Sequence, residues 1–253
     1  MLDIYFSVLI NLAIFALFGW ILSLKIKNVT HVDSMWSIFF VIALLTSVNS
    51  IEYVSERHEA LIIILFLWAI RLFGFLTKRN WGKTEDIRYQ NIRKNNEPMF
   101  KYKSLYLIFG FQAILASIIS LPLIASLLDI RDYNLIDKIA LAIILTGILI
   151  ETFADLQLSK FLKTNTGGVL NKGLWKYSRH PNYFGEFLIW WGFFIFSLGS
   201  GYLITIISPL LMTILLLKIS GVSLMEQTIT KRRPDYIKYI KKTSSFILWP
   251  PKN

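Results

Sequence analysis

Seven long runs of apolar residues divide this chain of 253 residues, and they constrain its fold more than any other feature. A helix needs about 20 apolar residues to cross the ~30 Å hydrocarbon core of a bilayer. Most of the runs approach this length, and the second is shorter. They cover residues 4–24, 35–49, 60–76, 104–127, 137–155, 182–199 and 202–219. We therefore predict an all-α, polytopic membrane protein with seven transmembrane helices.

The composition supports this class, since 55% of the residues are hydrophobic and 15% are aromatic. The chain has no cysteine, which excludes disulfides, thiolate metal sites and a cysteine nucleophile. No basic segment precedes the first apolar run, so we interpret this run as a retained helix and not as a signal peptide. We expect residues 1–253 to form a single membrane domain.

The charges between the apolar runs alternate along the chain. Loops 25–34, 77–103 and 156–181 and the C-terminal tail are basic, whereas loops 50–59 and 128–136 are acidic on balance. The positive-inside rule then places the N-terminus outside and the C-terminus in the cytoplasm. We expect an integral protein of a bacterial inner membrane.

Contacts with anionic membrane lipids explain most of the net charge of +11. We expect no nucleic-acid partner, because the basic segments flank the spans and form no known reader module.

The densest polar segment lies directly before the sixth apolar run. Its polar members are Arg179, His180, Asn182, Tyr183 and Glu186. Each ionisable group placed in hydrocarbon costs roughly 2.5–3.5 kcal/mol on insertion scales, so this density indicates a functional site. The alternative is an interfacial helix start with Pro181 at its first position. Glu186 favours the site, because it lies one helical turn beyond Asn182 and nearer the bilayer core.

Other charged residues lie inside or beside the apolar runs. Glu151 and Asp155 are four residues apart, so a helix places both carboxylates on one face. Such a pair needs partners, for example Arg179, His180 or a cofactor; alternatively, Asp155 lies in water at the helix end. Arg71 interrupts the third run and is either a cofactor contact or a snorkelling anchor.

Several of these residues carry a resemblance to a known family. The most specific part is the block Asn182-Tyr183-Phe184-Gly185-Glu186, and looser parts are Asp33, Trp36, Arg71, residues 85–89, Glu151, Asp155, residues 234–236 and residues 246–251. On this basis residues 145–251 resemble the steroid 5α-reductase C-terminal family. The whole chain is similar to its bacterial branch of uncharacterised, DUF1295-like membrane proteins.

The resemblance implies a reductase that uses NADPH to saturate an activated C=C bond in a lipid or steroid-like substrate. Hydride would reach the β-carbon of an enone while a donor polarises the carbonyl oxygen. The hydrophobic substrate would enter from the bilayer. The residues expected to bind NADPH are Arg71, Glu151, Asp155, Arg179, His180, Asn182, Tyr183, Glu186, Glu226 and Tyr236.

The chain departs from the steroid reductases at two positions. Those enzymes place a tyrosine, their carbonyl proton donor, one turn before the basic residue of the third span, where this chain has Trp68. An indole N–H is not a practical proton source, so a 3-oxosteroid is a poor fit as substrate. Asp33 is the acid nearest to the family's second-helix glutamate and is therefore the catalytic candidate. Alternatively, Asp33 caps that helix.

A second resemblance provides the alternative function. Arg179-His180-Pro181, the later Glu226 and the pair Tyr236 and Tyr239 are similar to membrane methyltransferases of the isoprenylcysteine and phospholipid type. Those enzymes bind S-adenosylmethionine, whose charged groups would need a carboxylate such as Glu226. They usually have adjacent glutamates where this chain has Met225-Glu226, and residues 145–165 fit the reductases better.

We expect no metal, because the three histidines, His31, His58 and His180, are scattered along the sequence. No glycine-rich dinucleotide motif or P-loop occurs. No inverted repeat of the kind found in transporters is visible, which disfavours a transport role.

Overall fold

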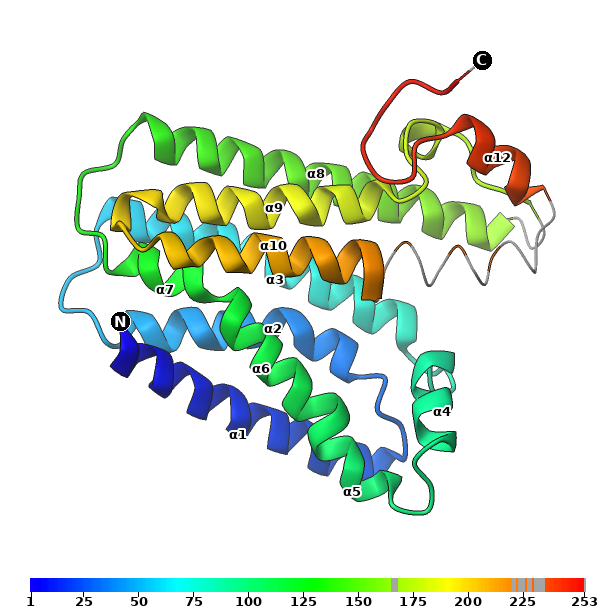
Figure 1. Cartoon of the computed structure of the whole chain (residues 1–253), viewed down its shortest axis with the longest axis horizontal. Coiled ribbons are helices and arrows are strands. Elements are labelled where there is room, and N and C mark those ends of the chain that lie inside the picture. Colours follow the sequence, from blue (N-terminus) through cyan, green and yellow to red (C-terminus); the bar gives the residue numbers. More distant parts are fainter. Residues whose placement is uncertain (165–167, 220–221, 223–225, 227–228, 230–234, 253) are drawn as a thin grey trace. The chain divides into compact units, whose positions relative to one another are not determined.

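The computed structural model describes residues 1–164, 168–219, 222, 226, 229 and 235–252. Within these residues the regular secondary structure is entirely helical (Figure 1), which confirms the predicted all-α class. Four helical segments in this part of the chain are long and apolar enough to cross a membrane. They are Leu2–Ile26, Glu56–Asn80, Phe100–Ile119 and Leu135–Thr164. Val32–Val48 and Leu203–Ile219 are apolar but shorter.

Every apolar run of the sequence coincides with helix. Five runs correspond to single helices, namely α1 (Leu2–Ile26), α2 (Val32–Val48), α3 (Glu56–Asn80), α8 (Leu135–Thr164) and α9 (Pro181–Ser197). The fourth run comprises α5 (Phe100–Ser104), η1 (Leu105–Gly110), α6 (Phe111–Ile119) and α7 (Leu121–Leu127). The last comprises η4 (Leu203–Ile206), α10 (Ile207–Ile214) and η5 (Leu215–Ile219). The number of seven spans and their orientation in the membrane stay predictions.

Short helices with fully described residues also lie between or after these segments. They are α4 (Ile87–Lys94), η2 (Gly173–Lys176), η3 (Leu198–Ser200) and α12 (Tyr236–Lys242). The contacts divide the chain into two compact units: unit 1 contains Met1–Tyr133 and Ser197–Thr205, and unit 2 contains Asn134–Phe196 and Ile206–Asn253. We describe each unit by itself, and the single domain over residues 1–253 stays a prediction.

In unit 1, α2 packs against both α1 and α3. Gly19 allows α1 to approach α2, since a Cβ atom there would lie 2.3 Å from the side chain of Met35. Trp68 of α3 is fully buried and its ring lies 5.6 Å from that of Phe40 on α2. Trp68, which replaces the tyrosine of the steroid reductases, is therefore a core packing residue.

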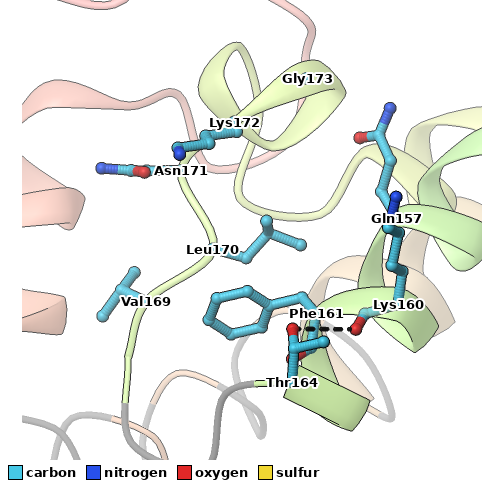
Figure 2. Close-up of a pocket in the computed structure, with 9 residues that line it drawn as sticks. All are labelled: Gln157, Lys160, Phe161, Thr164, Val169, Leu170, Asn171, Lys172 and Gly173. Carbon is cyan, nitrogen blue, oxygen red and sulfur yellow. Dashed lines mark hydrogen bonds between the residues drawn. The ribbon is translucent and has the colours of Figure 1, made fainter.

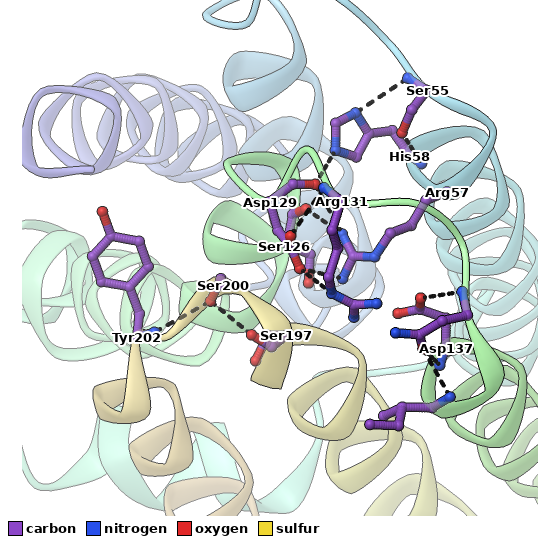
Figure 3. A network of polar contacts seen from close by, with 12 residues as sticks. Ser55, Arg57, His58, Ser126, Asp129, Arg131, Asp137, Ser197, Ser200 and Tyr202 are labelled. Carbon is purple, nitrogen blue, oxygen red and sulfur yellow. Dashed lines mark hydrogen bonds and ion pairs between the residues drawn. The ribbon is translucent and has the colours of Figure 1, made fainter.

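A buried polar network holds the start of α3 (Figure 3). Arg57 forms an ion pair of 3.3 Å with Asp129 and donates to the carbonyl oxygen of Ser126 at 2.7 Å. The backbone N–H of Ser55 donates to Nδ1 of His58, which leaves Nε2 to donate to the Asp129 carbonyl at 3.1 Å. These contacts tie α3 to the segment that follows α7.

In unit 2, α8 and α9 lie side by side (Figure 1) and approach closely at glycines. A Cβ atom on Gly185 would lie 2.6 Å from the carbonyl oxygen of Gly147 and 2.8 Å from the backbone nitrogen of Glu151. Small residues allow such close contact between apolar helices. This crossing positions the polar residues that lie near it on both helices.

Candidate functional site

The facing surfaces of α8 and α9 bring together four of the predicted site residues. Glu151, Asp155 and Glu186 are buried, although all three carry carboxylates. Asn182 of α9 donates from Nδ2 to Oδ1 of Asp155 on α8 at 3.2 Å. Polar residues of the fifth and sixth apolar runs thus lie together, and their role as a site stays a prediction.

The glycine crossing determines which parts of the two helices meet. Gly147, Glu151 and Asp155 follow one another at four-residue spacing, so they share one face of α8. Because Gly185 packs against the backbone of Glu151, the preceding turn of α9 carries Asn182 to Asp155. A side chain at Gly185 would separate the helices and break this arrangement.

Glu186 is oriented from within its own helix. Nε1 of Trp190 donates to Oε1 of Glu186 at 2.9 Å, and Trp190 is fully buried. This hydrogen bond joins residues one helical turn apart and holds the carboxylate of Glu186 toward the indole of Trp190.

A second cluster lies at the start of α9. Arg179 donates from Nε and Nη2 to the two carboxylate oxygens of Glu226, at 2.7 and 3.0 Å. Nε2 of His180 lies 3.2 Å from Oε1 of the same carboxylate. The His180 ring also stacks on Tyr183, with 5.6 Å between centroids and 3° between planes. A bidentate arginine–carboxylate pair of this kind has a well-defined geometry.

The C-terminal segment encloses this cluster. Nη1 of Arg179 donates to the carbonyl oxygen of Ile240 at 3.0 Å and to that of Thr243 at 2.7 Å. Both carbonyls lie at the C-terminal end of α12. These carbonyls have no partner within a helix, so the arginine caps α12. The backbone N–H of Arg179 donates to the Ser244 carbonyl at 2.8 Å. Ser178 adds a hydrogen bond of 2.7 Å from its hydroxyl to the Phe246 carbonyl.

The electrostatics of the cluster favour a charged Glu226. Burial by itself would raise the pKa of Glu226, but hydrogen bonds from His180 and Arg179 and their positive charge lower the pKa to about 2. Burial, together with the Glu226 charge, raises the pKa of Tyr236 to about 12. Burial also raises the pKa of Tyr239. At neutral pH the cluster therefore combines an ionised carboxylate with protonated phenols.

A recess of about 560 Å³ lies beside the end of α8 (Figure 2). Phe161 and Leu170 form its apolar wall, and the side chains of Lys160 and Lys172 stand on its rim. Gly173 has a positive φ of 59°, and a Cβ atom there would lie 2.5 Å from Oε1 of Gln157. Glycine is therefore required where this loop returns to α8.

Two predicted site residues belong to unit 1. Arg71 lies within α3, with its guanidinium 6.0 Å from the centre of the Phe75 ring. Asp33 lies in the first turn of α2. The proposed contribution of both residues to a common site with unit 2 stays a prediction.

The surroundings of Asp33 are those of a hydrogen-bond acceptor. Its two oxygens accept from Nη2 of Arg88 at 2.7 Å and from the hydroxyl of Tyr89 at 2.6 Å. Gln112 donates to the Tyr89 oxygen at 3.4 Å. Burial and the Asp33 charge raise the pKa of Tyr89, so the phenol stays protonated at neutral pH. The Tyr89 hydroxyl is thus a donor to Asp33 in this cluster, and a catalytic donor role for Asp33 stays a prediction.

Several residues around the site carry no motif signal in the sequence. They are Gly147, Trp175, Ser178, Trp190 and Thr243. Tyr239 donates to the Trp175 carbonyl, and Trp175 donates from Nε1 to the Ala154 carbonyl at 3.1 Å. The four-residue spacing of Gly147 from Glu151 and of Glu186 from Trp190 was a signal that could have identified two of them.

Comparison with known proteins gives one family and one relative. The model of the family described as "Protein of unknown function (DUF1295)" matches residues 19–243. An uncharacterized protein of Schizosaccharomyces pombe is 25% identical over 209 residues, and the match covers 70% of this chain. The chain spans 60% of the length of that relative. No solved structure matches the chain significantly.

Proposed function

The chain belongs to the DUF1295 family, which is steroid 5α-reductase-like, and from that premise we propose that it is a membrane-embedded reductase. The proposed enzyme saturates an activated C=C bond of a lipid or steroid-like substrate. NADPH, when bound, supplies the hydride. The observation that carries the proposal is the buried polar face of α8 and α9, where Asn182 meets Asp155.

This face has the chemistry to bind the uncharged polar parts of a dinucleotide. Carboxylates accept hydrogen bonds from ribose hydroxyls, as acidic residues do in dinucleotide-binding folds. Asp155, Glu186 and the amide of Asn182 would serve this purpose. Trp190 and the glycine crossing hold these groups in place before any ligand binds.

The phosphates of the cofactor need a different surface, because carboxylates repel them. The recess at the end of α8 offers Lys160 and Lys172 beside the Phe161 ring (Figure 2). An aromatic wall with lysines on the rim suits the adenine and phosphate end of the cofactor. We propose that the ligand extends from the polar face of α8 and α9 toward this recess.

The state of Glu226 supports the reductase over the methyltransferase. S-adenosylmethionine would need this carboxylate for its positively charged groups. Both oxygens of Glu226 already accept from Arg179, and one of them is also in contact with His180. A methyl donor would therefore compete with a bidentate pair that also holds the end of α12.

Thermal unfolding of the purified chain in detergent tests the proposal. A ligand at 100 times its Kd adds about 2.7 kcal/mol of stability. We expect NADPH to raise the unfolding temperature, S-adenosylmethionine to leave it unchanged, and Asp155→Asn to reduce the NADPH effect. Asp129→Asn is the matched control, because it removes a buried carboxylate of unit 1 and should preserve the response to NADPH.

Stabilisation by S-adenosylmethionine without any effect of NADPH would overturn the proposal in favour of the methyltransferase. If NADPH instead stabilises the purified chain, its oxidation in the presence of hydrophobic enones, followed by absorbance, would identify the substrate class.

A further inference from the structure

A second pocket, of about 410 Å³, lies at the end of α3 in unit 1. It is lined by residues from the last turn of α3, from the segment that follows, and from the start of α4. Those that matter here are Arg79, Asn80, Lys83, Thr84, Glu85 and Asp86. The pocket belongs to unit 1, whereas the polar residues of α8 and α9 belong to unit 2.

The two carboxylates on the lining are saturated by neighbouring arginines. Oδ1 of Asp86 accepts from the backbone and side chain of Arg88, both at 2.9 Å. Glu85 accepts from Nε and Nη2 of Arg93, both at 2.8 Å, and from the backbone N–H of Val29 at 3.0 Å. Burial by itself would raise the pKa of each carboxyl, but these bonds lower both pKa values. Their negative charge is thus compensated outside the pocket.

The cations on the lining are not compensated to the same degree. Arg79 is 3.7 Å from Asp33, whose oxygens already accept shorter bonds from Arg88 and Tyr89. Lys83 is exposed, and among the described residues its ammonium has no ion-pair or hydrogen-bond partner. Arg79 thus has a long ion pair with Asp33 and an electrostatic interaction with Asp86, and Lys83 is the less neutralised of the two cations that line the pocket.

Asn80 provides a further donor at this place. Its Oδ1 accepts from Nε of Arg79 at 3.2 Å, which leaves Nδ2 as the available group. Within the described part of the chain, this buried Nδ2 has no hydrogen-bond partner. A buried amide donor without a partner destabilises the folded protein, so an acceptor that enters the pocket would stabilise it.

We infer that this pocket binds a phosphate group through Arg79 and Lys83. Arginine and lysine are the side chains that proteins use for phosphate, and Asn80 and Thr84 can donate to further oxygens. The pocket lies where α3, a candidate membrane span, ends, which is the level of lipid headgroups. The phosphate comes from an anionic lipid or from a soluble phosphate ester, and the inference does not depend on the proposed reductase activity.

The test compares two double variants of the full chain. Arg79→Gln with Lys83→Gln removes the pocket cations. Lys25→Gln with Lys27→Gln removes two exposed lysines at the end of α1 and is the matched control. Thermal unfolding in detergent is measured with phosphatidylglycerol in mixed micelles, with inorganic phosphate, and with sodium chloride at the same ionic strength to correct for screening.

We expect the native chain and the control variant to be stabilised by a phosphate source beyond the effect of sodium chloride. The pocket variant should bind at least about tenfold more weakly, because charge-assisted hydrogen bonds are lost. A response to phosphatidylglycerol without one to inorganic phosphate would identify a lipid headgroup, and a response to inorganic phosphate without one to phosphatidylglycerol would identify a soluble phosphate ester.

Equal responses of the pocket and control variants, or no response of the native chain, would overturn the inference. NADPH should stabilise the pocket variant as much as the native chain. Loss of the NADPH effect in this variant would instead make the pocket part of the cofactor site and would contradict its independence.

Discussion

Two arginine–carboxylate pairs, Arg57–Asp129 in unit 1 and Arg179–Glu226 in unit 2, differ in their geometry and their surroundings: the first has an ion-pair contact of 3.3 Å, and the second is bidentate at 2.7 and 3.0 Å. In both pairs the arginine also donates to carbonyl oxygens of a distant segment. The side chains of Arg57 and Asp129 are 1% and 6% exposed, whereas those of Arg179 and Glu226 are 8% and 20% exposed. The second pair thus keeps partial access to solvent.

The neighbours of the two carboxylates differ more than the pairs themselves. The Asp129 carboxylate accepts from a second guanidinium, that of Arg131 at 2.8 Å, and the nearby imidazole of His58 contacts the backbone carbonyl of Asp129 and not its carboxylate (Figure 3). Glu226 instead has the titratable imidazole of His180 and the phenol of Tyr236 beside it. A buried ion pair by itself is therefore weak evidence of function. The groups around it separate a structural contact from a candidate site.

The largest expected effect is on the structural pair. Arg57→Met leaves Asp129 buried with one arginine fewer, and breaking a buried pair costs about 3–5 kcal/mol. We expect the free energy of unfolding to fall by about this amount, while NADPH still stabilises the remaining folded protein. Equilibrium unfolding in mixed micelles measures both. An unchanged stability would mean that water or Arg131 replaces the lost contacts.

The next effect concerns the glycine crossing of unit 2. Gly185→Ala places a Cβ atom 2.6 Å from the Gly147 carbonyl, so α8 and α9 must separate. We expect a loss of about 1–3 kcal/mol and a weaker response to NADPH. Gly74→Ala in α3 is the control, since a Cβ atom there meets no atom within 4 Å. A response to NADPH that survives Gly185→Ala would remove Asp155 and Asn182 from the proposed site.

A smaller effect is expected when the orientation of Glu186 is lost. Trp190→Phe preserves an aromatic ring in the core and deletes the hydrogen bond of 2.9 Å to the carboxylate. A hydrogen bond contributes about 0.5–1.5 kcal/mol net. We expect the NADPH affinity to fall more than the stability of the ligand-free protein. Ligand titration measures the NADPH affinity, and unfolding without ligand measures the stability. A loss of stability with unchanged affinity would show that Trp190 has only a structural role.

The smallest effect is a pH dependence specific to the second pair. The pKa of Glu226 is about 2 in the folded protein, below its ordinary value of 4.5. Because folding lowers this pKa, the carboxylate contributes stability above about pH 4.5 and loses that contribution as the pH falls toward 2. Unfolding measured between pH 6 and pH 2 should therefore be less pH-dependent in Glu226→Gln than in the native chain. Parallel profiles would show that the pair is solvated in both states.

The sequence predicted where some of the polar residues lie, for identifiable reasons, and their function as a site stays a prediction. Glu151 and Asp155 share a face because four residues make about one helical turn, and the structure places both in the interior of unit 2. The block 179–186 was identified because ionisable groups beside an apolar run are costly. The ion pair of Arg179 with Glu226 was not predicted, since the two residues are 47 positions apart and no local pattern relates them.

The prediction for Asp33 shows where sequence reasoning ended. Its place at the start of α2 was correct, but the sequence could not show that Arg88 and Tyr89 donate to both of its oxygens. Nor could it show that Trp68 fills the core against Phe40. Both depend on contacts between separate segments, which are decided by packing.

The sequence by itself therefore determined the class of this protein: helical, apolar and basic, with polar groups concentrated at a few helix positions. These properties follow from composition and from spacing along one helix, and both are local. Only the tertiary structure decided which polar groups meet, because the glycine contact between α8 and α9 and the C-terminal segment around Arg179 bring distant residues within hydrogen-bonding distance. Such contacts depend on how two helix surfaces fit together, whereas the spacing of residues along the sequence describes one helix at a time.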